Sequence, residues 1–165
     1  LRRYYKKQRD TKSRGHTVDM VMAALEARAD DAKRFIEPQK AHADVIFHLE
    51  PARSIKLSND LEPENIPLQL RISLRRSLYH EQLIRLLVGG CGLNVEHDID
   101  DTNSSIELLI TGNVLAEDLR SISGRLVAQS EELMDIDPVW NDGTIGVMQL
   151  VVMAQAAQIL RERAL

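Results

Sequence analysis

Hydrophobic and polar positions repeat along the chain with two different periods, which predict strands and helices. Residues 68–75 (LQLRISLR) place leucine or isoleucine at every second position, which is typical of a strand with one buried face. Residues 18–36 carry apolar side chains at spacings of three and four, the helical period. The same patterns predict further helices over 1–8, 80–89, 116–134 and 144–163, and further strands over 44–49, 93–99 and 105–112.

Capping and breaking residues divide these elements. Thr17 is the expected N-cap of the helix that follows the turn at residues 10–16, and Pro38 ends that helix. Pro51 ends the next strand. A stretch rich in proline, asparagine and acid then predicts a linker, so we expect domains at 1–51 and 68–165 joined by residues 52–67.

The order β-α-β-β-α-α beyond residue 67 predicts a small α+β module with helices on one face of an antiparallel sheet. Its last helix, 144–163, is apolar nearly all round and must therefore be covered on two sides. The sheet provides one cover. The second is either helix 116–134 or a partner subunit, which would make a homo-oligomer through the last helix. Trp140, just before this helix, is either an interface anchor or a buried packing residue.

Composition adds limits. The chain has 165 residues, a net charge of −4 and a single cysteine, Cys91, so an internal disulfide framework is excluded and a reducing, cytoplasmic setting is expected. Glutamines interrupt the last helix before about 18 apolar residues accumulate, so no membrane span is expected. The chain begins at Leu1 instead of a methionine, which suggests that a longer protein lies upstream.

The charge is unevenly distributed. Residues 1–14 carry seven basic residues and one acid, Asp10, whereas the remaining residues sum to −10. Lys6 and Arg9 share one helical face and Arg14 follows a turn, so three cations could converge on one polyanion such as a phosphate. Spacing alone leaves a solvated basic helix as the alternative.

Two motifs in this region resemble the phosphoribulokinase and uridine kinase family of P-loop kinases. The string RDTKSRGH (9–16) resembles the lid turn of that family, and IEPQKAHADVI (36–46) resembles its next signature. The resemblance implies that residues 1–51 are a helical lid fragment and one strand of a P-loop kinase core. It also implies that Lys6, Arg9 and Arg14 are lid cations that touch ATP and substrate phosphates, with Asp10 orienting the arginines. Beyond residue 67, GVMQL (146–150) and the glycine-rich turn resemble more loosely the C-terminal extension of bacterial members.

The sequence departs from the family in one respect. It contains no GxxxxGK[ST] phosphate loop, and GGCG (89–92) lacks the lysine and hydroxyl that such a loop needs. We therefore expect the C-terminal part of an ATP- and Mg²⁺-dependent kinase that acts on a ribose-type hydroxyl. This part is expected to be inactive alone and to act with an N-terminal P-loop region as its partner. The alternative is a non-catalytic oligomerisation or regulatory module.

Other chemistry has little support in the sequence. DIDD (98–101) lacks the glycine and glutamate of a calcium loop, and the five histidines form no zinc motif, so no metal site is expected. Cys91 has no evident activating base, and His16 is either a phosphate contact or a plain turn residue. Nucleic-acid binding by the basic segment lacks a module signature and is opposed by the acidic remainder of the chain.

Overall fold

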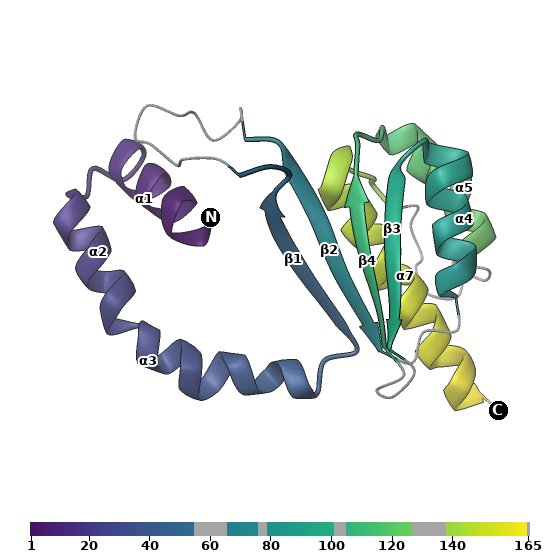
Figure 1. The fold of residues 1–165 in the computed structure, drawn as a ribbon, viewed down its shortest axis with the longest axis horizontal. Helices are drawn as coiled ribbons and strands as arrows, with labels where there is room; N and C mark the ends of the chain where they lie inside the picture. The colour runs from purple at the N-terminus through teal and green to yellow at the C-terminus, as the bar shows by residue number, and fades with distance from the viewer. Residues whose placement is uncertain (55–65, 76–78, 101–104, 127–137, 165) are drawn as a thin grey trace. The chain divides into compact units, whose positions relative to one another are not determined.

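A computed structural model describes residues 1–54, 66–75, 79–100, 105–126 and 138–164. The chain divides into two compact units, one formed by Leu1–Ala43 with Glu50–Leu68 and the other by Asp44–Leu49 with Gln69–Leu165. The expected linker at 52–67 lies mostly outside the described residues, and the expected domain boundary stays a prediction. The α+β fold is confirmed, with an N-terminal helical fragment and a four-stranded antiparallel sheet (Figure 1).

The first unit consists of successive helices. Helix α1 spans Arg2–Lys12 and α2 spans Val18–Ala27. The short α3, Ala29–Asp31, continues into a π-helical turn and a 3₁₀-helix that end at Ala41. Among these helices proline occurs only in the 3₁₀-helix, as Pro38, because its missing N–H cannot continue an α-helical ladder.

Two expected boundaries in this unit were wrong. Helix α1 continues to Lys12, so the expected turn at 10–16 begins only after that residue. The expected single helix over 18–36 is interrupted at Arg28, whose backbone lies at φ −97° and ψ 1°. No glycine or proline marks that position in the sequence. Thr17 caps α2 as expected, because its hydroxyl accepts a hydrogen bond from the Met20 N–H at 3.3 Å.

The second unit is built on a sheet with strand order β1-β2-β4-β3. Its strands are β1 (Val45–Pro51), β2 (Leu68–Arg75), β3 (Asn94–Asp100) and β4 (Ser105–Thr111). Strand β1, which the family resemblance assigns to the kinase core, therefore lies at one edge beside β2. It continues through Pro51, where we expected it to stop, because an edge position leaves the missing proline N–H without consequence.

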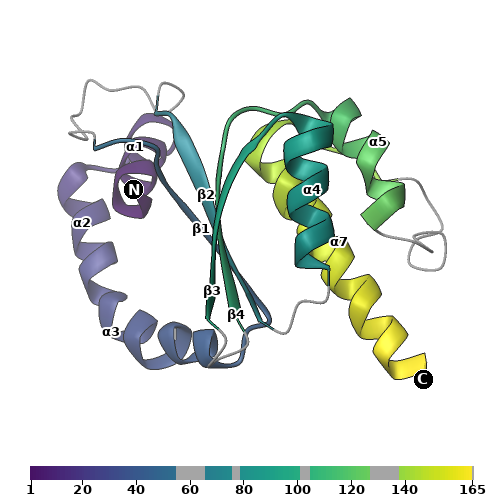
Figure 2. The same cartoon turned by 45° about the vertical axis from the view of Figure 1, so that its right-hand side comes forward.

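Helices α4 (His80–Cys91), α5 (Ala116–Leu126) and α7 (Gly143–Ala164) cover one face of this sheet (Figure 2). Residues 127–134 of the expected helix 116–134 lie outside the described residues. The period-2 pattern of β2 is reproduced: Leu70, Ile72 and Leu74 are fully buried, and Arg71 and Ser73 face away from the helices. Register pairs Leu70 with Ile110 and Ile72 with Leu108, so the two central strands contribute facing rows to the core.

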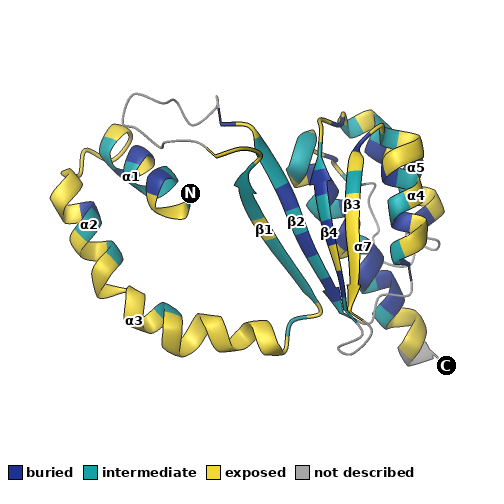
Figure 3. Cartoon of the chain, viewed as in Figure 1, coloured by how far each residue is buried: buried dark blue, intermediate teal, exposed yellow. Residues whose placement is uncertain are grey.

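Burial is concentrated in the second unit (Figure 3). Leu83 and Leu87 of α4, Leu119 of α5 and Leu150 of α7 are all fully buried in its core. Trp140 belongs to the same core at 9% exposure, which favours the packing interpretation of this residue over the interface anchor.

Helix α7 is long and apolar enough to cross a membrane by length and composition, although glutamines interrupt its sequence, and the expectation that it does not span one stays a prediction. Its Val147, Leu150 and Val151 are nevertheless buried in the core against the sheet, as in the core helix of a folded domain.

Candidate functional site: a carboxylate that gathers cations

The candidate site lies at the C-terminal end of α1 and the turn behind it. The helix ends with a hydrogen bond from the Ser13 N–H to the Arg9 carbonyl at 2.9 Å. The chain then reverses through Gly15, whose φ of +67° lies in the left-handed region that favours glycine. The His16 N–H donates to the Asp10 carbonyl at 3.0 Å, so the turn is tied back to the helix.

This turn places Arg14 within reach of Asp10. The Asp10 carboxylate is 6% exposed and forms ion pairs with Arg9 Nε at 2.9 Å and with an Arg14 guanidinium nitrogen at 3.4 Å. Both arginine side chains remain more than half exposed, at 55% and 56%. One buried carboxylate therefore anchors two guanidinium groups whose outer surfaces face solvent.

Electrostatics at Asp10 reflect the same arrangement. The hydrogen bond from Arg9 and the positive charges of Arg9, Arg14 and Lys6 hold the pKa of Asp10 below its ordinary value of 3.8, although burial acts in the opposite direction. Asp10 is therefore ionised at neutral pH. A carboxylate that is already engaged by two arginines and has a lowered pKa is suited to orienting cations and poorly suited to accepting a proton.

The structure thus brings together the three residues singled out from the sequence. Lys6 precedes Asp10 by one helical turn and contributes to its electrostatic environment, while Arg9 and Arg14 contact it directly. Sequence spacing allowed the convergence of the cations, with a solvated basic helix as the alternative. It did not reveal the burial of Asp10, because that burial depends on contacts between α1 and the rest of its unit.

Within the described residues, the remaining candidates from the sequence form no second cluster of this kind. The side chain of His16 is exposed, and only its backbone takes part in the turn. Burial and the nearby charge of Asp118 raise the pKa of the Cys91 thiol to about 11, so this cysteine is a weak nucleophile. Among the described residues no group of three histidine, cysteine, aspartate or glutamate side chains could hold a metal ion. Of the DIDD segment, Asp101 lies outside the described residues.

One polar feature was missed by the sequence analysis. On the outer face of the sheet, Arg71 pairs with Glu107 at 3.5 Å beside a hollow of about 210 Å³ that Glu96 and Asp98 also line. The sequence pattern could have revealed this feature, since these residues occupy polar positions of three strands in which apolar and polar residues alternate, and the register places these strands side by side.

Comparison with known proteins identifies the segment that contains the cation site. The sequence model of the Phosphoribulokinase / Uridine kinase family matches residues 1–56. Over this segment the chain is similar to that family, as the two motifs at 9–16 and 36–46 indicated.

The relatives that share the segment are phosphoribulokinases. The chloroplastic enzyme of Spinacia oleracea is 43% identical over 51 residues, which cover 31% of this chain and 13% of the relative. The enzyme of Synechocystis sp. is 44% identical over 52 residues, covering 32% of this chain and 16% of the relative. The chloroplastic enzyme of Triticum aestivum is 39% identical over 56 residues, covering 34% and 14%. The matched segment thus spans about one seventh of the length of these relatives.

Proposed function

We propose that residues 1–51 are the lid segment and a core strand of an ATP-dependent kinase that phosphorylates a hydroxyl of a ribose-type substrate. The family match over residues 1–56 supports this proposal. The observation that carries it is the ion-pair cluster: Asp10 holds Arg9 and Arg14 in place while more than half of each arginine side chain is exposed to solvent. Positively charged groups held in this way suit the oxygens of a polyphosphate.

In this proposal each residue has a distinct role. Lys6, Arg9 and Arg14 bind phosphate oxygens of ATP and substrate, and Asp10 fixes the direction of the two guanidinium groups. Bound ATP with Mg²⁺ would supply the phosphoryl group and offset part of its charge. The phosphate loop, the metal ligands and the general base would come from a P-loop region, because the sequence contains no GxxxxGK[ST] motif.

The exposed apolar residues of the first unit support a P-loop region as the partner. Met20, Phe35 and Ile36 are 60%, 56% and 56% exposed, although each is large and apolar. Exposed apolar side chains of this size are available for contact with another part of a protein. We accordingly propose that the 165-residue chain alone does not transfer phosphate, and that the kinase is a soluble protein of the cytoplasm.

The test uses the kinase that carries this segment together with its P-loop region. Replacing Arg9 or Arg14 by alanine removes a cation from the migrating phosphoryl group, so kcat/KM should fall by about 100-fold or more. Arg3→Ala is the matched control, because Arg3 is an exposed arginine of the same helix without a role in the cluster, and it should stay within about twofold of the wild type. Lys6→Ala should also lower kcat/KM.

Asp10→Asn separates positioning from binding. It keeps the size of the side chain but loses the charge that holds the two arginines, so both KM for ATP and kcat should change while the variant remains folded. Equal activities of the Arg9, Arg14 and Arg3 variants would contradict the assigned roles. Phosphoryl transfer by the 165-residue chain alone, assayed with ATP, Mg²⁺ and a panel of pentose phosphates and nucleosides, would contradict the proposed need for a P-loop region.

A second candidate function concerns residues 68–165. The family match ends at residue 56, and helix α7 of the second unit carries an exposed apolar face, which favours a non-catalytic assembly module.

A further inference from the structure

A hollow of about 280 Å³ lies between the start of α5 and the turn at 139–141 that precedes α7. Its volume is close to the lower end of the range for small-molecule pockets, roughly 300–1,000 Å³, and an apolar cavity of about 150 Å³ can already hold a benzene ring. The hollow is therefore large enough for one small organic molecule. Its lining residues are Ala116, Glu117, Arg120, Val139 and Trp140.

Hydrogen bonds hold the walls of this hollow in place. The Ala116 N–H, at the start of α5, donates to Asp142 Oδ1 at 2.7 Å, which ties the turn to that helix. Gln149 of α7 accepts from the Asn141 N–H at 2.9 Å and donates to the Val139 carbonyl at 3.1 Å, which ties the turn to the second helix. The hollow is thus formed without a ligand, and a ligand that enters it does not have to order its walls.

Two of the lining side chains are large and apolar. Trp140 is only 9% exposed and belongs to the core of its unit, so its indole ring is held by packing. Val139 is 85% exposed. An apolar group that covers these side chains removes apolar surface from water, which favours binding. This part of the hollow therefore suits the hydrocarbon portion of a ligand.

Two opposite charges line the same hollow from α5. Glu117 and Arg120 are three positions apart, so they share one face of the helix, with Cβ atoms about 5–6 Å from each other. Both are exposed, and neither side chain forms a hydrogen bond or an ion pair with another residue in the parts of the chain that the structure describes. The carboxylate can accept hydrogen bonds from an ammonium group, and the guanidinium can donate to a carboxylate.

We propose that this hollow binds a free α-amino acid with a large apolar side chain, such as leucine or phenylalanine. Arg120 binds the α-carboxylate, Glu117 binds the α-ammonium group, and the apolar side chain lies against Trp140 and Val139. The two charged groups of such a ligand are attached to one carbon atom, so two neighbouring side chains on one helix face can reach both. A residue inside a peptide carries neither charge, and a simple apolar acid or amine carries only one. This inference does not depend on the kinase activity proposed above.

The experiment is isothermal titration calorimetry of the 165-residue chain with L-leucine and L-phenylalanine. A Kd of about 0.1–1 mM is expected for a ligand of this size, and the emission of Trp140, the single tryptophan, should change on binding. L-alanine leaves the apolar part of the hollow unfilled and should bind about 10-fold more weakly or worse. N-acetyl-leucine lacks the ammonium group and leucinamide lacks the carboxylate, so each should also bind about 10-fold more weakly or worse.

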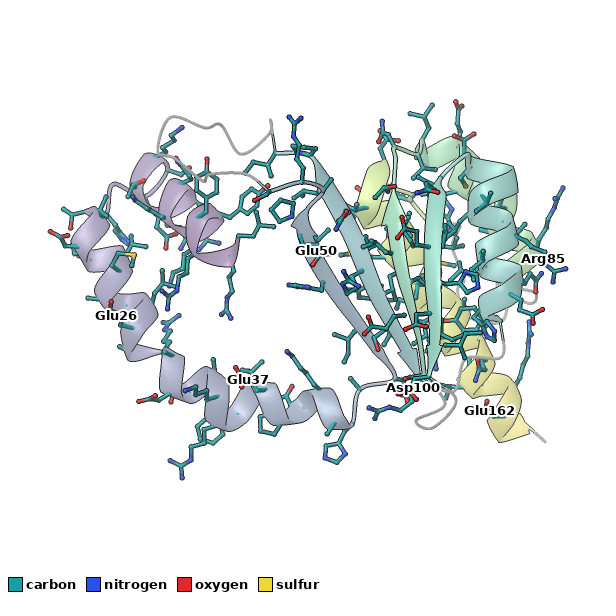
Figure 4. The ribbon with its side chains drawn as sticks, in the orientation of Figure 1. Glu26, Glu37, Glu50, Arg85, Asp100 and Glu162 are labelled. Carbon is teal, nitrogen blue, oxygen red and sulfur yellow. The ribbon has the colours of Figure 1, made fainter. Side chains whose placement is uncertain are left out.

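Two variants assign the charges to their partners. Arg120→Gln should weaken leucine binding by about 10-fold or more and have little further effect on leucinamide, whereas Glu117→Gln should weaken leucine binding similarly and have little further effect on N-acetyl-leucine. The matched controls are Glu81→Gln and Arg85→Gln in α4. Glu81, like Glu117, lies in the first turn of its helix, and Arg85 is exposed and projects from the outer side of α4 (Figure 4). Both controls should bind leucine within about twofold of the wild type.

Three results would overturn the proposal. They are the absence of binding at about 10 mM leucine, equally tight binding of leucine and its two blocked analogues, and equal weakening by the α5 variants and the α4 controls. Circular dichroism should show that all four variants keep the native fold. The comparison of leucine with its analogues uses the wild-type chain alone, so it decides the question even where a variant fails to fold.

Discussion

Replacing Gly146 by alanine tests the packing of the second unit at a single atom. Gly146 lies in the first turn of α7, where an added Cβ would press into the Asn141 carbonyl oxygen and the Leu119 side chain, with the Asn141 carbonyl carbon at 3.1 Å. The turn that contains Asn141 cannot easily move away, because the Asn141 N–H donates to Gln149 on the same helix at 2.9 Å.

The expected magnitude follows from two opposing effects. Glycine to alanine in a helix interior normally stabilises a protein by about 0.5–1 kcal/mol. Overpacking a core typically costs about 1–3 kcal/mol, and the upper part of that range applies when a backbone atom is the obstacle. We expect a net loss of about 2 kcal/mol in the free energy of unfolding, which corresponds to roughly 10 °C in Tm for a unit of this size.

Urea unfolding followed by tryptophan fluorescence measures this loss directly. Trp140 is the single tryptophan of the chain, is buried in the core and lies beside Asn141 in sequence. The matched control is Gly89→Ala in α4, because a Cβ at Gly89 meets nothing within 4 Å, and this variant should be slightly stabilised. If Gly146→Ala unfolds at the same urea concentration as Gly89→Ala, the close approach of α7 to the 139–141 turn is wrong.

Three further outcomes are expected. Because the pKa of Asp10 is lowered, its ionised carboxylate stabilises the folded state fully above the ordinary value of 3.8, and this stabilisation is lost as the pH falls through the lower folded value. NMR titration should therefore show α1 loosening only in that acid range, and Asp10→Asn should lack the transition. With a pKa of about 11, the Cys91 thiol should react slowly with a disulfide reagent near pH 8 and faster as the pH rises, and Asp118→Asn should speed the reaction modestly. Rapid labelling of the native chain at pH 8 would contradict this. Tyr79→Phe removes the hydroxyl that donates to buried Gln155 at 3.1 Å and should cost about 1–2 kcal/mol in urea unfolding, whereas an unchanged midpoint would show that the bond contributes nothing.

The elements with a strong local signal were predictable from the sequence. Strand β2 has the predicted bounds, because strict alternation leaves one possible buried face for Leu68–Arg75. The capping hydroxyl of Thr17 and the glycine of the 13–16 turn act within a few residues of themselves, so they too could be recognised. The cations Lys6, Arg9 and Arg14 were identified from their spacing and from a family motif that the comparisons confirm over residues 1–56.

Features that depend on long-range contacts could not be predicted. The sequence names Asp10 but does not show that its carboxylate is buried between two arginines, and it does not distinguish Gly146 from Gly89. Helix α7 is apolar all round, so its sequence predicts a helix without predicting which side enters the core. The sequence by itself therefore determined the order and type of most elements and the family of the first 56 residues. Only the tertiary structure decided that β1 pairs with β2, how tightly α7 approaches its neighbours and which of its faces remains exposed. These outcomes are set by contacts between residues far apart in the chain, and local periodicity carries no information about them.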